Sequence, residues 1–84
     1  DTHTVWKCLA DVINPRTGVS LIEAKLIDRL EVNTDEGGVF AEVLLCELDE
    51  SYAENIEEEI REHVMAIPGA LKVLVQFKPC VHCG

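Results

Sequence analysis

Four cysteines are the residues in this sequence best suited to chemistry, and two of them lie three positions apart near the C-terminal end. Cys80 and Cys83 form a C-x-x-C pair with His82 between them. Thiolates at this spacing can hold one Zn or Fe ion in a tight turn, but a closed tetrahedral site needs four ligands. Cys46, His82 and Cys8 are the candidates for the remaining positions. The spacing therefore indicates a thiolate metal or cluster site that uses Cys80 and Cys83, joined by Cys46.

Two other interpretations of the C-x-x-C pair stay open. Cys80 and Cys83 could form a redox-active disulfide, although that role usually places the motif at the start of a helix rather than at a chain end. The pair could also be an unliganded tail, or the start of a metal-binding extension that continues after Gly84.

Composition limits the classes of function. The chain has 84 residues, 48% of them hydrophobic, which is enough for one small folded domain. A net charge of −9 argues against binding to nucleic acid or to an acidic membrane surface. The first residues lack the basic start and apolar stretch of a signal peptide, and no apolar run approaches the roughly 18 residues of a membrane span. We expect a cytoplasmic protein with reduced thiols rather than a secreted disulfide scaffold.

The first half of the chain predicts a helix followed by a β-hairpin. Thr4 can cap a short helix over residues 5–13, and the segment Asn14-Pro15-Arg16-Thr17-Gly18 then stops it. Residues 26–34 alternate as a strand, with Asp28, Leu30 and Val32 expected on one face and Ile27, Arg29 and Glu31 on the other. Asp35-Glu36-Gly37-Gly38 is a hairpin turn, and residues 39–48 form the returning strand. Its core-facing residues are predicted to be Val39, Ala41, Val43 and Leu45.

The second half predicts a longer helix and a last strand. Ser51 and Glu54 have the spacing of a capping box at the start of a helix over residues 51–67. Its buried stripe consists of Tyr52, Ile56, Ile60, Val64 and Ile67. Asp49 and Glu50 precede this helix and are explained by its dipole. The last strand covers residues 70–78, with Leu71, Val73, Val75 and Phe77 expected to point inward.

This order of elements predicts an α+β fold, a two-layer α-β-β-α-β sandwich whose helices lie on one face of a three-stranded mixed sheet. The hairpin is antiparallel, and a right-handed crossover returns the last strand parallel to the second. Parallel strands end at the same edge of a sheet, so Cys46 and Cys80 should meet there, on the face away from the core. We expect one domain over residues 1–79 and a C-terminal C-x-x-C tail over residues 80–84.

Several short segments resemble the PaaD/SufT-like family of iron–sulfur assembly proteins. The segment 11–18 is similar to the family's V-x-D-P-E-x-G, residues 20–27 are similar to an "sIvdLGLV"-like segment, and residues 67–75 are close to l-p-G-V-x-x-V-x-V. The resemblance implies the same α-β-β-α-β fold and a part in assembling or delivering Fe–S clusters, or in maturing a metalloenzyme. It also makes a homodimer plausible.

The chain departs from this family at informative positions. Members usually carry a reactive cysteine followed by proline just before the second helix, where this chain has Ser51 and Tyr52. Cys46 lies about five residues earlier, inside the expected strand, and Lys25 stands where a glycine is common. The family's activity therefore does not transfer residue by residue.

Two main hypotheses of function follow. The first is a non-enzymatic accessory protein for Fe–S or metal-site assembly, in which Cys80 and Cys83, joined by Cys46, hold Zn, Fe or a cluster transiently. Its partners would be assembly proteins or a client metalloprotein. The second is an interaction module whose sheet face, carrying Phe40, Leu44 and Leu74, binds a partner while the thiols are incidental. We expect no catalytic residues.

Overall fold

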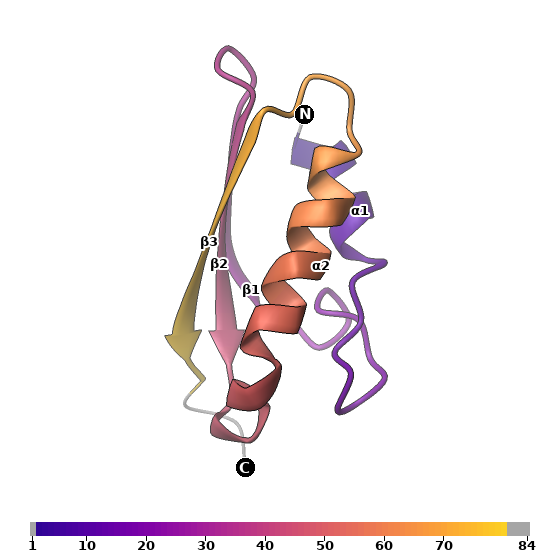
Figure 1. Ribbon diagram of the computed structural model, residues 1–84, viewed down its shortest axis with the longest axis vertical. Helices are drawn as coiled ribbons and strands as arrows, with labels where there is room; N and C mark the ends of the chain where they lie inside the picture. Colours follow the sequence, from indigo (N-terminus) through magenta and orange to yellow (C-terminus); the bar gives the residue numbers. More distant parts are fainter. Residues whose placement is uncertain (1, 81–84) are drawn as a thin grey trace.

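The computed structural model describes residues 2–80 and shows two helices packed on one face of a three-stranded sheet (Figure 1). The elements are α1 (Thr2–Leu9), β1 (Ile27–Asn33), β2 (Gly38–Leu45), the 3-10 helix η1 (Glu47–Tyr52), α2 (Ala53–Met65) and β3 (Lys72–Pro79). β2 is the central strand, antiparallel to β1 and parallel to β3. The predicted α+β fold is confirmed.

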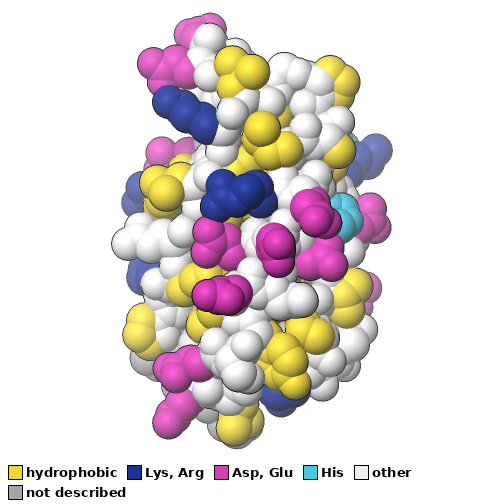
Figure 2. All heavy atoms as spheres, viewed as in Figure 1, with side chains coloured by type: hydrophobic (Ala, Val, Ile, Leu, Met, Phe, Trp, Pro, Cys, Tyr) yellow, Lys and Arg dark blue, Asp and Glu magenta, His cyan; other side chains and the backbone are white. Residues whose placement is uncertain are grey.

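The core lies between the sheet and the two helices. Val39, Ala41 and Val43 of β2 are buried, as the alternation predicted. The predicted stripe of α2 packs against them through Ile56, Ile60 and Val64, with Tyr52 and Ile67 at its two ends partly buried. The acidic residues of α2 lie on its outer side, where Figure 2 shows acidic side chains gathered over the middle of the molecule. Burial of apolar side chains between the sheet and both helices is the main source of stability.

β1 differs from its predicted pattern because it contains a bulge. The pairing with β2 shifts between Ile27 and Arg29, so Asp28 has no partner of its own in the ladder. An extra residue reverses the alternation on one side of the bulge. Ile27 therefore lies on the core side with Leu30 and Val32, whereas Asp28 is exposed and accepts a hydrogen bond from Lys78 at 3.2 Å. The prediction that Asp28 shares a face with Leu30 was wrong.

The start of the second helix also differs from the prediction. Residues 47–52 form the 3-10 helix η1, and α2 begins only at Ala53 with Tyr52 in the capping position. Tyr52 makes no side-chain capping bond, so the capping box expected from Ser51 and Glu54 does not form. Ser51 lies inside η1, so it does not stand at the N-cap position that a capping box requires.

The segment between α1 and β1 is compact although it is neither helix nor extended strand. α1 ends at Leu9 rather than at residue 13, and Ile13 instead pairs with Ser20 in an isolated bridge. Lys25, just before β1, has a φ of 58°, in the left-handed region that glycine tolerates best. This conformation is the physical reason why a glycine would suit that position.

The hairpin at residues 34–37 packs closely on the connection between α2 and β3. Gly37 has a φ of 67°, and a Cβ atom placed there would lie 2.6 Å from the carbonyl oxygen of Gly69 and 2.8 Å from Cγ of Leu71. Leu71 lies before β3 rather than in it and is 71% exposed, so the prediction that it faces the core was wrong. Val73 is buried, and Val75 and Phe77 are partly buried, as predicted.

Candidate functional site

The carboxyl ends of β2 and β3 bring two cysteines to one edge of the sheet. Leu45 and Pro79 are paired in the parallel register, and the backbone N–H of Cys80 donates to the carbonyl oxygen of Leu45 at 3.2 Å. Cys46 follows Leu45 directly, so the two cysteines stand just beyond the paired ends of β2 and β3, although 34 residues separate them in the sequence. The parallel pairing of β2 and β3, from which we expected both cysteines at this edge, is confirmed.

The two cysteines differ in their surroundings. Cys46 is only 7% exposed and is disulfide-bonded, whereas Cys80 is half-buried and carries a free thiol. Among residues 2–80, Cys8 on α1 is a second half-buried free thiol. Burial of Cys46 differs from the open sheet face on which we expected it, because the chain turns into η1 at this residue.

A hollow of about 410 Å³ lies beside Cys80 at this edge. Its walls come from the ends of β2 and β3 and from η1, namely Leu45, Glu47, Glu50, Phe77, Lys78, Pro79 and Cys80. The lining combines one thiol, two carboxylates and one ammonium group. The hollow lies where open α/β sheets commonly bind ligands.

The described residues alone do not complete a metal site. Within residues 2–80, no three side chains of His, Cys, Asp or Glu are grouped closely enough to hold a metal ion. Cys83 and His82, the remaining candidates from the sequence, lie outside the described residues. Cys46 and Cys80 are thus the described part of the predicted ligand set.

A buried polar cluster supports the turn that follows Cys46. Asp49 is 1% exposed and accepts hydrogen bonds from Nε and Nη2 of Arg16 and from Nδ2 of Asn14, the last at 3.2 Å. Its own backbone N–H donates to the carbonyl oxygen of Cys46 at 2.8 Å. Asp49 therefore links the segment at residues 14–16 to the turn that carries Cys46.

The electrostatics of this cluster favour the ionised carboxylate. Hydrogen bonds from Arg16 hold the pKa of Asp49 below its usual value, against the opposing effect of burial, and the bond from Asn14 acts in the same direction. Asn14 also accepts a hydrogen bond from the backbone N–H of Arg16 at 2.9 Å, which shapes the segment that presents the guanidinium. The cluster is a fixed polar contact at the edge where the thiols lie.

Sequence reasoning missed this cluster. It assigned Asp49 to the dipole of the following helix and treated Arg16 only as part of a turn. The available signal was the change in charge at residues 14–16, which read Asn-Pro-Arg where the resembling family has Asp-Pro-Glu. The structure pairs this basic residue, Arg16, with Asp49.

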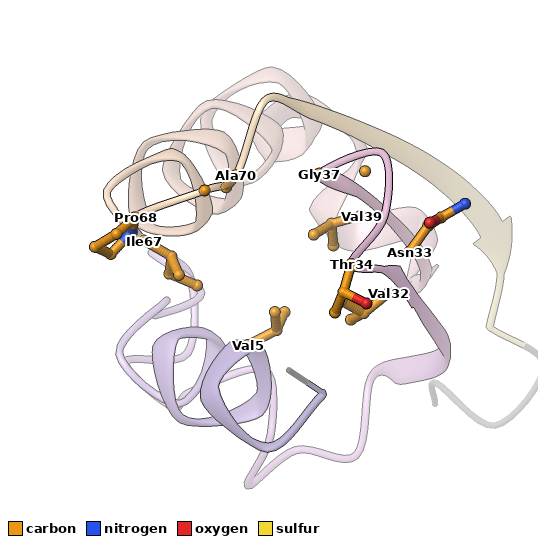
Figure 3. Close-up of a pocket in the computed structure, with 11 residues that line it drawn as sticks. Val5, Val32, Asn33, Thr34, Gly37, Val39, Ile67, Pro68 and Ala70 are labelled. Carbon is orange, nitrogen blue, oxygen red and sulfur yellow. The ribbon is translucent and has the colours of Figure 1, made fainter.

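The opposite end of the sheet carries a different cavity, of about 140 Å³. In Figure 3, the side chains of Val5, Val39 and Ile67 point toward it from α1, β2 and the end of α2. Among the described residues that line it, Asn33 and Thr34 are the only polar side chains, and neither is a nucleophile activated by a neighbouring base. This end offers apolar contact but no arrangement suited to chemistry.

Comparison with known proteins agrees with the resemblance seen in the sequence. The family model described as "Iron-sulfur cluster assembly protein" matches residues 2–77. No curated protein matches the chain. A domain of unknown function, DUF59, from Bacillus anthracis has a similar structure, with a TM-score of 0.82, 15% identity, and coverage of 93% of this chain and 76% of that one.

A second solved structure is more distantly similar. It is a Mycobacterium tuberculosis protein described as associated with Fe–S complex assembly and repair, with a TM-score of 0.59 and 17% identity. The match covers 98% of this chain and 71% of that one. At these identities, the two structures establish the shared fold alone.

Proposed function

The chain belongs to the iron–sulfur cluster assembly protein family, and we propose that it is a non-enzymatic accessory protein that holds or delivers iron or an Fe–S cluster through cysteine thiolates. The observation that carries this proposal is the position of Cys46 and Cys80 at adjoining ends of two parallel strands. Cys83 follows Cys80 closely enough in sequence to supply a third thiolate. The iron or cluster is the cargo of the protein rather than a resident cofactor.

The donor set fits such cargo. Thiolates are the usual ligands of Fe–S clusters and also bind Zn well. Glu47 and Glu50 line the same hollow as Cys80 and place negative charge beside its thiol. Lys78, which also lines it, forms ion pairs with Asp28 and Glu42 on the open face of the sheet.

Cargo binding and the disulfide at Cys46 exclude each other, because a metal ligand must be a thiolate. Binding through Cys46 therefore requires a dithiol reductant, which supplies two electrons and is itself oxidised to a disulfide. We propose that the protein acts in a reducing compartment, the cytoplasm. Its partners would be iron–sulfur assembly proteins or a client metalloprotein. Within residues 2–80, no helix is long and apolar enough to cross a membrane.

The test is the iron and sulfide content of protein reconstituted anaerobically with a dithiol reductant. We expect Cys80→Ser and Cys46→Ser each to lower the bound iron at least several-fold while the folded structure is kept. Cys8→Ser is the matched control, because Cys8 is also a half-buried free thiol but does not line the hollow. Unchanged iron in all three variants, or iron-free protein after reconstitution, would contradict the proposal.

A second candidate function is supported by the open face of the sheet. Leu74 is 64% exposed there, beside Phe40, its partner in the parallel register. A groove runs over these residues and is bordered by Glu31, Glu36 and Lys72. Exposed apolar side chains with a charged border suit a protein interface. In this alternative the domain binds an assembly partner or a client, and the thiols are incidental.

One pair of variants separates the two candidates. Leu44→Asp places a charge on the open face, and Cys80→Ser removes the thiol of the hollow. If the interaction module is correct, the first variant loses partner capture and the second retains it. If thiolate delivery is correct, Cys80→Ser loses iron transfer to an apo-ferredoxin acceptor whether or not the face is intact.

A further inference from the structure

The outer edge of β3 is a strand edge with a defined set of unpaired backbone groups. Lys72 and Cys80 both donate their N–H groups toward the β2 side, to the carbonyl oxygens of Gly37, just before β2, and of Leu45, its last residue. In a parallel ladder every second residue does so, which assigns Leu74, Gln76 and Lys78 to the same inner set. Val73, Val75, Phe77 and Pro79 therefore direct their N–H and C=O groups outward.

At one end of this outward set the carbonyl oxygen of Val73 already accepts a hydrogen bond, and at the other end Pro79 lacks a donor. Nη1 of Arg61, from α2, donates to the carbonyl oxygen of Val73 at 3.0 Å. Pro79 has no N–H to donate. Between these ends, Val75 and Phe77 each present one N–H and one C=O. Within residues 2–80, no strand lies beyond β3, which forms the outer edge of the sheet in Figure 1.

This set of groups is complementary to itself. When two copies of β3 are placed antiparallel about a two-fold axis through Gln76, Val75 of one copy lies opposite the partner's Phe77. Such directly opposed residues exchange two hydrogen bonds in an antiparallel ladder. The same pairing places Val73 opposite the partner's Pro79. Pro79 has no N–H group to donate to the partner's Val73. The carbonyl oxygen of Val73 does not need that bond, because it already accepts one from Arg61.

The side chains agree with this register. Val75 opposite the partner's Phe77 is a β-branched and aromatic pair, which is favourable across neighbouring strands. Lys78 lies opposite the partner's Leu74, so no like charges are directly opposed. Leu74 is one of the most exposed large apolar residues of the chain, and the stem of Lys78 would cover part of it. β3 also contains no acidic residue, in a chain with a net charge of −9.

The other edge of the sheet lacks these properties. β1 contains the bulge at Asp28 and exposes Arg29 and Glu31, features that disfavour pairing with another strand. We propose that the protein forms a symmetric dimer through β3, which joins two three-stranded sheets into one six-stranded sheet with Gln76 on the two-fold axis. The two thiol edges then lie at opposite ends of the shared strand pair.

A cysteine placed on the axis tests this geometry. Residues 76 of the two copies would form a non-hydrogen-bonded pair with a Cα separation of about 4.5 Å, which a disulfide can span. We expect Gln76→Cys to give a covalent dimer on mild oxidation. Leu74→Cys is the matched control, because it lies on the same face but opposite Lys78. It should crosslink no more than the unchanged chain, whose own cysteines set the background.

A second variant removes one outward donor and leaves the pairing with β2 intact. Val75→Pro eliminates the N–H that points away from the sheet, at an edge position where proline is tolerated. We expect it to weaken dimerisation, measured by sedimentation equilibrium under reducing conditions, at least tenfold. Added to Gln76→Cys, it should abolish the crosslink.

Three results would overturn the proposal. They are a monomer mass at every concentration up to the millimolar range, equal crosslinking of Gln76→Cys and Leu74→Cys, and a dimer that Val75→Pro does not affect. None of these depends on iron or sulfide, so the dimer and the proposed thiolate function fail separately.

Discussion

The two ends of the sheet are held together by different forces. At the carboxyl ends of β2 and β3, a buried carboxylate of η1, Asp49, binds the loop after α1 through Arg16 and Asn14. At the hairpin end, the chain segments meet by close backbone approach at Gly37 and by apolar side chains around a small cavity. The first end contains ionisable groups and thiols, whereas none of the described residues that line the cavity at the second end is ionisable. The difference indicates that one end positions reactive groups while the other fixes the hairpin.

The largest effect is expected at the polar end. Replacing Asp49 with Ala leaves Asn14, which is 2% exposed, without its hydrogen-bond acceptor, and removes the ion pair with Arg16. Because a buried polar group without a partner is costly, we expect Asp49→Ala to lower the free energy of unfolding by about 3 kcal/mol. Urea denaturation measures it. A decrease as small as that of an exposed substitution such as Glu58→Ala would show that the cluster does not hold this end.

At the hairpin end, Gly37→Ala should be the most damaging small substitution. The new Cβ would overlap the carbonyl oxygen of Gly69, and alanine also disfavours the positive φ. We expect a loss of about 2 kcal/mol. Gly18→Ala is the control, because Gly18 has a similar φ of 73° but nothing within 4 Å of its Cβ position.

The control isolates the contribution of close approach. Backbone strain alone leads us to expect a loss of about 1 kcal/mol for Gly18→Ala. If both variants lose the same stability in urea denaturation, contact with Gly69 and Leu71 does not fix the hairpin, and the comparison between the two ends fails.

Acid should weaken the polar end selectively. The pKa of Asp49 is lowered in the folded protein, so its ion pair contributes fully above the unfolded value of about 4. That contribution is lost as the pH falls from there through the folded pKa. Unfolding free energy measured from pH 7 to pH 3 should decrease less steeply in Asp49→Asn than in the unchanged protein. Parallel pH profiles would contradict the assignment of the ionised carboxylate to this cluster.

Regular hydrophobic patterns made most of the fold predictable from the sequence. The predictions failed where the backbone is locally irregular, at the bulge in β1 and at η1. The alternation in β2 and the apolar stripe of α2 identified buried residues such as Val43 and Ile60 correctly, because burial on one face imposes a period. The bulge at Asp28 was not predictable in this way, since one extra residue reverses the alternation without changing composition. The 3-10 helix η1 was not predictable either, because its acidic and serine residues are the same residue types that begin an α-helix.

The site was predictable where topology determines it and not where loops do. Cys46 and Cys80 could be placed at one edge because parallel strands end together. The contact between Arg16 and Asp49 joins a loop to the 3-10 helix η1, 33 residues further along the chain, and no periodic pattern relates the two residues. The departures from the resembling family were the better guide there, since Arg16 and Lys25 both stand where its pattern has another residue.

Lys25 gives the smallest expected effect and concerns neither end of the sheet directly. Its φ of 58° places a residue with a Cβ in the left-handed region, just before β1 begins. Lys25→Gly removes this strain but increases the freedom of the unfolded chain, so we expect a net gain of about 0.5 kcal/mol. The gain should appear in urea denaturation without change in iron binding, because Lys25 does not line the hollow beside Cys80. A loss of stability would show that the unfolded-chain entropy outweighs the relief of strain, and that the family's glycine is not favoured by this backbone.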